Sequence, residues 1–299
     1  MESFITKDDF YQISSAGLTH VRIPFGFWGI DVSGGEPYIV GNRFEKLKQA
    51  VHWAHDANIK VVIDLHGAPG SQNGLDNSGH LGSVNWYQDQ NKVNRTLYYV
   101  KTLANEFTKP EYKNTVEIIE LLNEPQAAAH PDMMETLKKF YQNGYNTVHA
   151  TGAATMIHDG FVDINTWNNF LTSNTGAQNV YLDLHKYEVF SDSQLQKSDN
   201  DRIGEVCQYK PQLQSHSQNQ HWTVVGEFSA AITDCAKYLN GRGIGARYDG
   251  SYSGSSYIGS CQGKSGSGDD WTEDYKNRVK SFWNAQIDSW EGGKGYFFW

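Results

Sequence analysis

The segment KVVIDLHG, residues 60–67, is a run of apolar, mostly β-branched residues that ends in Asp64, His66 and Gly67. Such a run is typical of a strand that is buried on both faces of a parallel sheet. Similar runs recur along the chain with helical patterns between them, which indicates repeated βα units. The predicted strands are Thr19–Phe25, Lys60–Leu65, Glu117–Leu122, Ala154–His158, Val180–Leu184, Thr223–Gly226 and Gly295–Trp299. The predicted helices are Lys7–Ser15, Phe44–Ala57, Lys92–Phe107, Met133–Ala150, Tyr209–Ser217 and Thr272–Trp290, with a helical turn near Asn165–Leu171.

The order of these elements favours one α/β domain over residues 1–299, without internal repeats or a linker. A helix precedes the first predicted strand, although every helix of a closed barrel follows a strand. The seven predicted strands and one missing strand would make a (β/α)8 TIM barrel that lacks its first strand and the segment after the eighth. An open doubly wound sheet is the alternative, but no glycine-rich phosphate loop follows the first strand.

Polar side chains follow most of the predicted strands, where the active site of a TIM barrel lies. A single charged strand end is commonly a helix cap or an ion pair, but six together indicate a functional site. The strand ends are Arg22-Ile23-Pro24-Phe25, Asp64-Leu65-His66-Gly67, Leu122-Asn123-Glu124-Pro125, Asp183-Leu184-His185-Lys186-Tyr187, Gly226-Glu227-Phe228 and Phe298-Trp299.

Two of these residues, Glu124 and Glu227, match the chemistry of glycoside hydrolysis. That reaction needs one protonated carboxyl group for the leaving oxygen and one ionised carboxylate for the anomeric carbon. Retention of configuration requires the two groups about 5 to 5.5 Å apart. Asn123 can donate its amide to a sugar 2-hydroxyl, and two ion-paired glutamates are the non-catalytic alternative.

The composition limits the class of partner. A net charge of −9 without a basic run argues against nucleic acid and against an anionic membrane. No stretch approaches the length of a membrane span, and the opening MESFITKDDF has no export signal. The 9 Trp, 17 Tyr and 14 Phe suit either core packing or stacking on sugar faces. A neutral substrate and a monomeric protein are expected.

Three cysteines lie in the C-terminal third, where Gly, Ser and Tyr dominate and helices are not expected. Cys235 and Cys261 bracket a glycine-rich loop, which suits a disulfide in an oxidising compartment. Free thiols in a cytosolic protein are the alternative. The odd count leaves Cys207 free or paired with a cysteine outside this sequence, and the sequon Asn94-Arg95-Thr96 fits a secreted protein.

Longer motifs carry a resemblance to a known family. The segments are AGLTHVRIPFGFW (16–28), VVIDLHGAPGSQNGLDNSG (61–79), LLNEP (121–125), YLDLHKYEVF (181–190), VVGEFSAAITDCAKYLNGRGIGARYDGS (224–251) and GYFFW (295–299). With them the chain resembles fungal exo-β-1,3-glucanases, the glucan 1,3-β-glucosidases of glycoside hydrolase family 5. The Asn-Glu-Pro triplet marks a broad clan of retaining hydrolases, whereas HGAPGSQNG and GEFS…DCAKYLNG narrow the likeness to the fungal enzymes.

The resemblance implies a cofactor-independent and metal-independent hydrolase that releases glucose from the non-reducing end of β-1,3-glucan in fungal cell-wall metabolism. It implies that Glu124 is the acid/base and Glu227 the nucleophile. The implied residues around the first glucose are Arg22, His66, Asn123, His185, Tyr187 and Trp299, with Phe190 and an aromatic of the 71–86 loop at the entrance. It also implies the disulfide Cys235–Cys261, and a partner for Cys207 beyond residue 299.

Departures from the family's pattern affect the expected behaviour. The relatives begin with a secretory signal and a first strand, and they continue past Trp299. Loss of one strand from a closed barrel exposes two sheet edges. We therefore expect a chain truncated at both ends that folds poorly and shows little activity, and that derives from an extracellular or cell-wall enzyme.

Three other functions are compatible with parts of the sequence. An endo-β-1,4-glucanase, or another family 5 β-glycosidase, would share the two glutamates, but the insertions at 70–90 and 235–270 favour a walled pocket for chain-end attack. A metal-dependent hydrolase built on Asp64, His66 and His185 would need a His-x-His pair, which is absent. A catalytically silent glucan-binding barrel would bind sugar without turnover.

Overall fold

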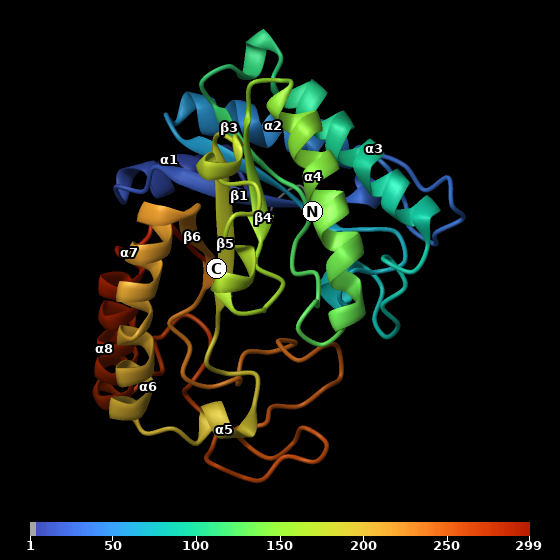
Figure 1. Ribbon diagram of the computed structural model, residues 1–299. Helices are drawn as coiled ribbons and strands as arrows, with labels where there is room; N and C mark the ends of the chain where they lie inside the picture. The colour runs from blue at the N-terminus through green and yellow to red at the C-terminus, as the bar shows by residue number, and fades with distance from the viewer. Residues whose placement is uncertain (1–3) are drawn as a thin grey trace. The chain divides into compact units, whose positions relative to one another are not determined.

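The computed structural model describes residues 4–299, which divide into two compact units (Figure 1). The first unit ends at Asp183, and the second runs from Leu184 to Trp299. Both units contain parallel strands joined through helices, as the sequence predicts. None of the described helices combines the length and the apolar character that crossing a membrane requires.

The first unit is built around parallel strands that pair in chain order. Strand β1 pairs with β2, β2 with β3, β3 with β4, and β4 with β5. The strands are β1 (His20–Gly26), β2 (Lys60–Gly67), β3 (Val116–Glu120), β4 (Ala154–His158) and β5 (Val180–Lys186), whose last three residues belong to the second unit. The helices are α1 (Lys7–Ser15), α2 (Arg43–Asp56), α3 (Gln90–Phe107) and α4 (Met134–His149).

The core of this unit follows from the patterns of β2 and α3. Residues 61–65 of β2 are all buried, as expected of a strand covered on both faces. Helix α3 buries one stripe, and Asp89 caps its start by accepting a hydrogen bond from the backbone N–H of Asn91. The stripe consists of Val93, Thr96, Tyr99, Val100, Leu103, Ala104 and Phe107.

The second unit contains two further parallel strands and a group of helices. Strand β6 (Trp222–Phe228) pairs with β7 (Tyr296–Phe298). Helices α6 (Asp199–Cys207) and α7 (Tyr209–Asn219) both pack against α8 (Glu273–Trp290), as Figure 1 shows, and the short α5 (Asp192–Leu195) precedes them. Cys235 and Cys261 form a disulfide across the loop between β6 and α8, and Cys207 is an exposed free cysteine.

All seven predicted strands are present in the described residues, with ends that differ by up to two residues. Strand β3 shows the difference most clearly, since it ends at Glu120 rather than at Leu122. After β3 the chain leaves the regular sheet and reaches Glu124, whose backbone has a φ of +46°. A local departure of this kind is not encoded in an apolar run.

The expectation that helices are absent around the cysteines was wrong for Cys207, which ends helix α6. The helix starts where the Ser198 side chain accepts a hydrogen bond from the backbone N–H of Asp201. Asp199 and Asp201 in the first turn favour a helix N-terminus, and the buried face consists of Arg202 and Val206. Because a buried arginine replaces an apolar residue on this face, the helical period is not visible in the sequence.

Candidate active site

Arg22 on β1 is the centre of a buried polar cluster in the first unit. Its Nε donates to Glu120 Oε2 at 2.7 Å, and its Nη2 donates to Asn123 Oδ1 at 2.9 Å. The same Nη2 lies 3.1 Å from Asp64 Oδ2, and Nε lies 4.0 Å from Asp183 Oδ2. One guanidinium thus faces side chains from the ends of several strands, as expected at the carboxyl edge of a parallel sheet.

Glu120 is fully buried in this cluster. Burial raises the pKa of Glu120 well above its usual range, and the carboxylates of Asp64 and Asp183 act in the same direction against the charge of Arg22. A neutral Glu120 reduces the excess of negative charge around one guanidinium. Asp64 Oδ2 also lies 2.6 Å from His66 Nδ1, which ties that ring to the cluster and sets which ring nitrogen faces away.

Asn123 is held on three sides and has one unused donor. Its backbone N–H donates to Leu65 O at 3.0 Å, its carbonyl accepts from Gln72 Nε2 at 2.9 Å, and its Oδ1 accepts from Arg22. Within residues 4–299, Asn123 Nδ2 is buried without a hydrogen-bond partner. A buried donor without a partner costs free energy unless a ligand accepts from it.

Glu124 has the features of a strained functional residue. It is 7% exposed, and its φ of +46° lies in the left-handed region that L-residues other than Asn and Asp rarely adopt. Asn77 Nδ2 donates to Glu124 Oε2 at 3.0 Å from the loop that follows β2. The backbone strain and the bond from Asn77 together fix the direction of this carboxyl group.

In the second unit, Glu227 on β6 is the other glutamate that the sequence singles out. It is 5% exposed, and its Oε2 accepts a 2.8 Å hydrogen bond from the phenol of Tyr187. His185 Nδ1 lies 3.5 Å from the same oxygen. His185 belongs to β5 and Tyr187 follows it directly, so the end of one strand orients the carboxyl group on another.

The aromatic residues predicted around the substrate have exposed surface. Phe190 is 44% exposed, and its ring lies 5.4 Å from that of Tyr187 in an edge-on arrangement. Trp299 is 50% exposed and follows β7, where its backbone N–H donates to Phe228 O at 2.9 Å. Both rings therefore have area available for contact with a ligand.

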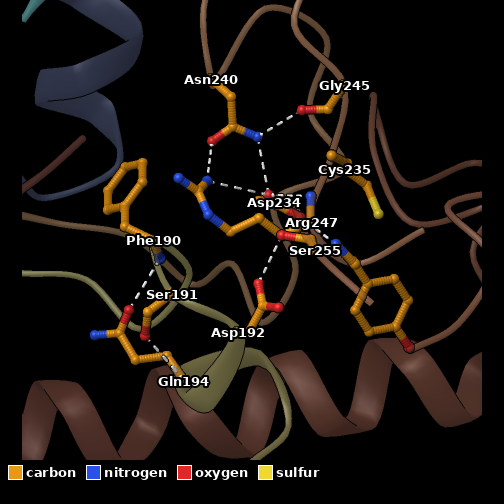
Figure 2. A network of polar contacts seen from close by, with 12 residues as sticks. Phe190, Ser191, Asp192, Gln194, Asp234, Cys235, Asn240, Gly245, Arg247 and Ser255 are labelled. Atoms are coloured by element: carbon orange, nitrogen blue, oxygen red, sulfur yellow. Dashed lines mark hydrogen bonds and ion pairs between the residues drawn. The ribbon is translucent and has the colours of Figure 1, made fainter. Parts of the chain in front are cut away.

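The loop closed by the disulfide is organised around the buried carboxylate of Asp234. Asp234 accepts from Asn240 Nδ2 at 2.9 Å and from the backbone N–H groups of Arg247 and Tyr248 at 2.7 and 2.9 Å. Figure 2 shows this network beside the neighbouring segment, to which it is joined by the hydroxyl of Ser255. The loop is thus fixed by polar contacts in addition to the covalent bridge.

Sequence reasoning missed three residues of the first unit that act on the predicted site. Glu120 lies within an apolar run, and a charged residue in a run of that kind is the only signal that could have found it. Asn77 and Gln72 lie in the HGAPGSQNG–LDNSG segment that carries the family resemblance, but nothing in their spacing shows which groups they contact.

Parallel strands that alternate with helices, with polar side chains at the ends of the strands, are the features of the TIM-barrel class of folds. The family described as Cellulase (glycosyl hydrolase family 5) matches residues 1–243. The chain belongs to glycoside hydrolase family 5. The structure therefore confirms the predicted fold class, and the family confirms that this chain is a glycoside hydrolase.

Two relatives that share about two fifths of the residues of this chain are glucan 1,3-beta-glucosidases. The chain is 40% identical to the glucan 1,3-beta-glucosidase of Lachancea kluyveri, with 99% of this chain and 68% of the relative covered. It is 41% identical to that of Blumeria graminis at the same coverages.

Among solved structures, the rutinosidase from Aspergillus niger matches with a TM-score of 0.73 and 18% identity, covering 99% of this chain and 75% of that one. Thermotoga maritima Cel5A in complex with cellobiose matches with a TM-score of 0.61 and 16% identity, covering 99% of this chain and 83% of that one. At such identities the likeness concerns the fold alone.

Proposed function

We propose that this protein hydrolyses β-1,3-glucan from the non-reducing end and releases glucose with retained configuration. The observation that carries the proposal is the identity of about two residues in five, over 99% of the chain, to fungal glucan 1,3-β-glucosidases. The proposed substrate is a glucan oligosaccharide or polysaccharide. The proposed site consists of the two glutamates and the residues around the first glucose and the entrance, which are Glu124, Glu227, Arg22, His66, Asn123, His185, Tyr187, Trp299 and Phe190.

Glu227 is proposed as the nucleophile that attacks the anomeric carbon of a terminal glucose. In support, its carboxylate is nearly buried and accepts a hydrogen bond from Tyr187, which holds the carboxyl group in one orientation. The covalent glucosyl-enzyme that forms is then hydrolysed by water.

Glu124 is proposed as the acid that protonates the departing glucan and as the base that activates water in the second step. The bond from Asn77 and the backbone strain at Glu124 are consistent with a carboxyl group held in one direction. Asn123 Nδ2 is proposed to donate to the 2-hydroxyl of the reacting glucose, where the bond strengthens as positive charge develops.

A secreted location at the cell wall is proposed with this substrate. It is supported by the disulfide Cys235–Cys261, since such bonds persist in oxidising compartments. A monomer is proposed for the protein in solution, which sedimentation equilibrium would test.

The test is product analysis with the purified 299-residue chain, whose normal turnover together with a cooperative melt would overturn the expectation of poor folding and little activity drawn from the family's pattern. We expect laminarin, a β-1,3-glucan, to yield glucose from the first time point without intermediate oligosaccharides, and carboxymethylcellulose to remain intact. Glu227→Gln should abolish release, whereas Glu135→Gln, at an exposed position of α4, should not. A ladder of oligosaccharides from a β-1,4-glucan, or binding of laminarin without turnover, would contradict the proposal.

A further inference from the structure

The segment between Tyr187 and α5 is held by the amide of one side chain, Gln194. Its Nε2 donates to the carbonyl of Tyr187 at 2.9 Å, and its Oε1 accepts from the backbone N–H of Phe190 at 2.9 Å. The bond to Phe190 is visible in Figure 2. A single planar amide thus fixes both ends of the turn that carries two proposed site residues.

Gln194 is itself held in place by its surroundings. Its backbone N–H donates to Ser191 Oγ at 3.2 Å, and its carbonyl accepts from Arg202 Nη2 at 2.9 Å. Arg202 is 2% exposed, and its Nη1 donates to Glu188 O at 2.7 Å. A buried guanidinium therefore braces the turn from the side of α6.

The same turn is tied to the disulfide-closed loop. Asp192, which begins α5, accepts a 2.8 Å hydrogen bond from the hydroxyl of Ser255 (Figure 2). Ser255 lies between Cys235 and Cys261 in the chain. The turn thus has fixed attachments on two sides, and Gln194 transmits them to Tyr187 and Phe190.

We propose that Gln194 is a positioning residue that sets Tyr187 against Glu227 and, through the same amide, sets the ring of Phe190. The inference rests on the proposed function for the roles of Glu227 and Phe190. Gln194 contributes to cleavage through the Tyr187 bond to the nucleophile. Through the exposed ring of Phe190, it also influences whether water or a second sugar accepts the glucosyl group, and therefore the ratio of hydrolysis to transglycosylation.

Two substitutions separate the two contacts. Gln194→Met keeps the length of the side chain and removes both hydrogen bonds. Gln194→Glu, when ionised, can still accept from the N–H of Phe190 but cannot donate to the carbonyl of Tyr187. We expect Gln194→Met to change both cleavage and acceptor choice, and Gln194→Glu to lower cleavage while the ratio of transglycosylation to hydrolysis stays near that of the wild type.

The kinetic test is a double-mutant cycle on kcat/KM for an aryl β-glucoside. Gln194→Met should lower kcat/KM about 10-fold in the wild-type background, a loss of about 1.4 kcal/mol. In a Tyr187→Phe background the further loss should be less than about 3-fold, because the contact that Gln194 supports is already gone. Gln212→Met, at an exposed position of α7, is the matched control. Equal losses in both backgrounds would overturn the proposal.

A readout without turnover separates this inference from the proposed function. With 3-fluorotyrosine at position 187, the ¹⁹F resonance reports the contact of the phenol with Glu227. Gln194→Met should move the resonance in the same direction as Glu227→Ala, and Gln212→Met should leave it in place. An unmoved resonance would overturn the positioning role even in an active enzyme, whereas a moved resonance in a protein without glucosidase activity would reject the proposed function alone.

Discussion

Tyr187 donates a 2.8 Å hydrogen bond to Oε2 of Glu227, and His185 Nδ1 lies 3.5 Å from the same oxygen. All three side chains are contributed by the ends of β5 and β6. Because Glu227 is only 5% exposed, water replaces these contacts poorly. The orientation of the proposed nucleophile therefore depends on a phenol forty residues earlier in the chain.

Tyr187→Phe removes this hydrogen bond and leaves the ring. A hydrogen bond to a charged group contributes about 1.5 to 3 kcal/mol, so we expect kcat/KM for an aryl β-glucoside to fall about 10- to 100-fold. Circular dichroism should show an unchanged fold. Activity within about 2-fold of the wild type would show that Glu227 keeps its orientation without the phenol.

Glu120→Gln tests the charge state of the Arg22 cluster. Burial raises the pKa of Glu120 above its ordinary 4.5, so the wild-type protein carries extra stability at low pH that is lost as the pH rises through the folded-state pKa. Urea unfolding from pH 4.5 upward should show the free energy of unfolding of the wild type decreasing relative to Glu120→Gln. Glu117→Gln, at an exposed position of the same strand, is the control. A difference that does not change with pH would contradict this account.

His216→Gln tests a buried histidine pair in the second unit. His216 Nε2 lies 3.1 Å from His221 Nδ1, and burial, followed by the charge of His221, lowers the pKa of His216 from 6.5 to about 4. The unfolded chain binds a proton that the folded protein excludes, so stability is lost as the pH falls from 6.5 towards 4. Between pH 6.5 and pH 4, the midpoint temperature of thermal unfolding should fall less in His216→Gln than in the wild type. The exposed variant His55→Gln should show the same fall as the wild type.

Replacement of Cys235 and Cys261 together by serine opens the loop between β6 and α8. The two cysteines are 26 residues apart in sequence, and closure of such a loop contributes about 3 kcal/mol through the unfolded chain. We expect a lower melting temperature by differential scanning calorimetry. Cys207→Ser, at the exposed free cysteine, should leave it unchanged. An unchanged melt of the double variant would mean that the Asp234 network alone holds the loop.

The sequence predicts much of the fold because burial on both faces makes each parallel strand an apolar run. Strand β4 (Ala154–His158) has the predicted bounds for this reason. Helix α6 was missed because its buried face includes Arg202, whose guanidinium donates to the backbone carbonyls of Glu188 and Gln194 in the preceding turn. A charged residue with such partners looks like a surface residue in the sequence.

The sequence singles out residue types for the candidate site but does not reveal the contacts that those residues make. Glu124 follows β3 and Glu227 lies near the end of β6, each in a recognisable motif, so the sequence could place both at strand ends. The roles of Asn77, Glu120 and Gln194 come from hydrogen bonds across 47, 98 and 7 residues respectively, and no local period encodes them. The contacts of Arg22 could not be predicted either, because they join β1 to residues of β2 and β3 that are far away in the sequence.

The most direct test of the proposed mechanism is rescue by azide of Glu227→Ala and Glu124→Ala on an activated aryl β-glucoside. Azide should enter the space left by the nucleophile in Glu227→Ala and give the α-glucosyl azide by one inversion. In Glu124→Ala it should attack the glucosyl-enzyme and give the β-glucosyl azide by two inversions. Proton NMR of the anomeric coupling distinguishes the two products. The α product from Glu227→Ala and the β product from Glu124→Ala are predicted, and the reverse assignment, or no azide product from either variant, would contradict the roles proposed for these glutamates.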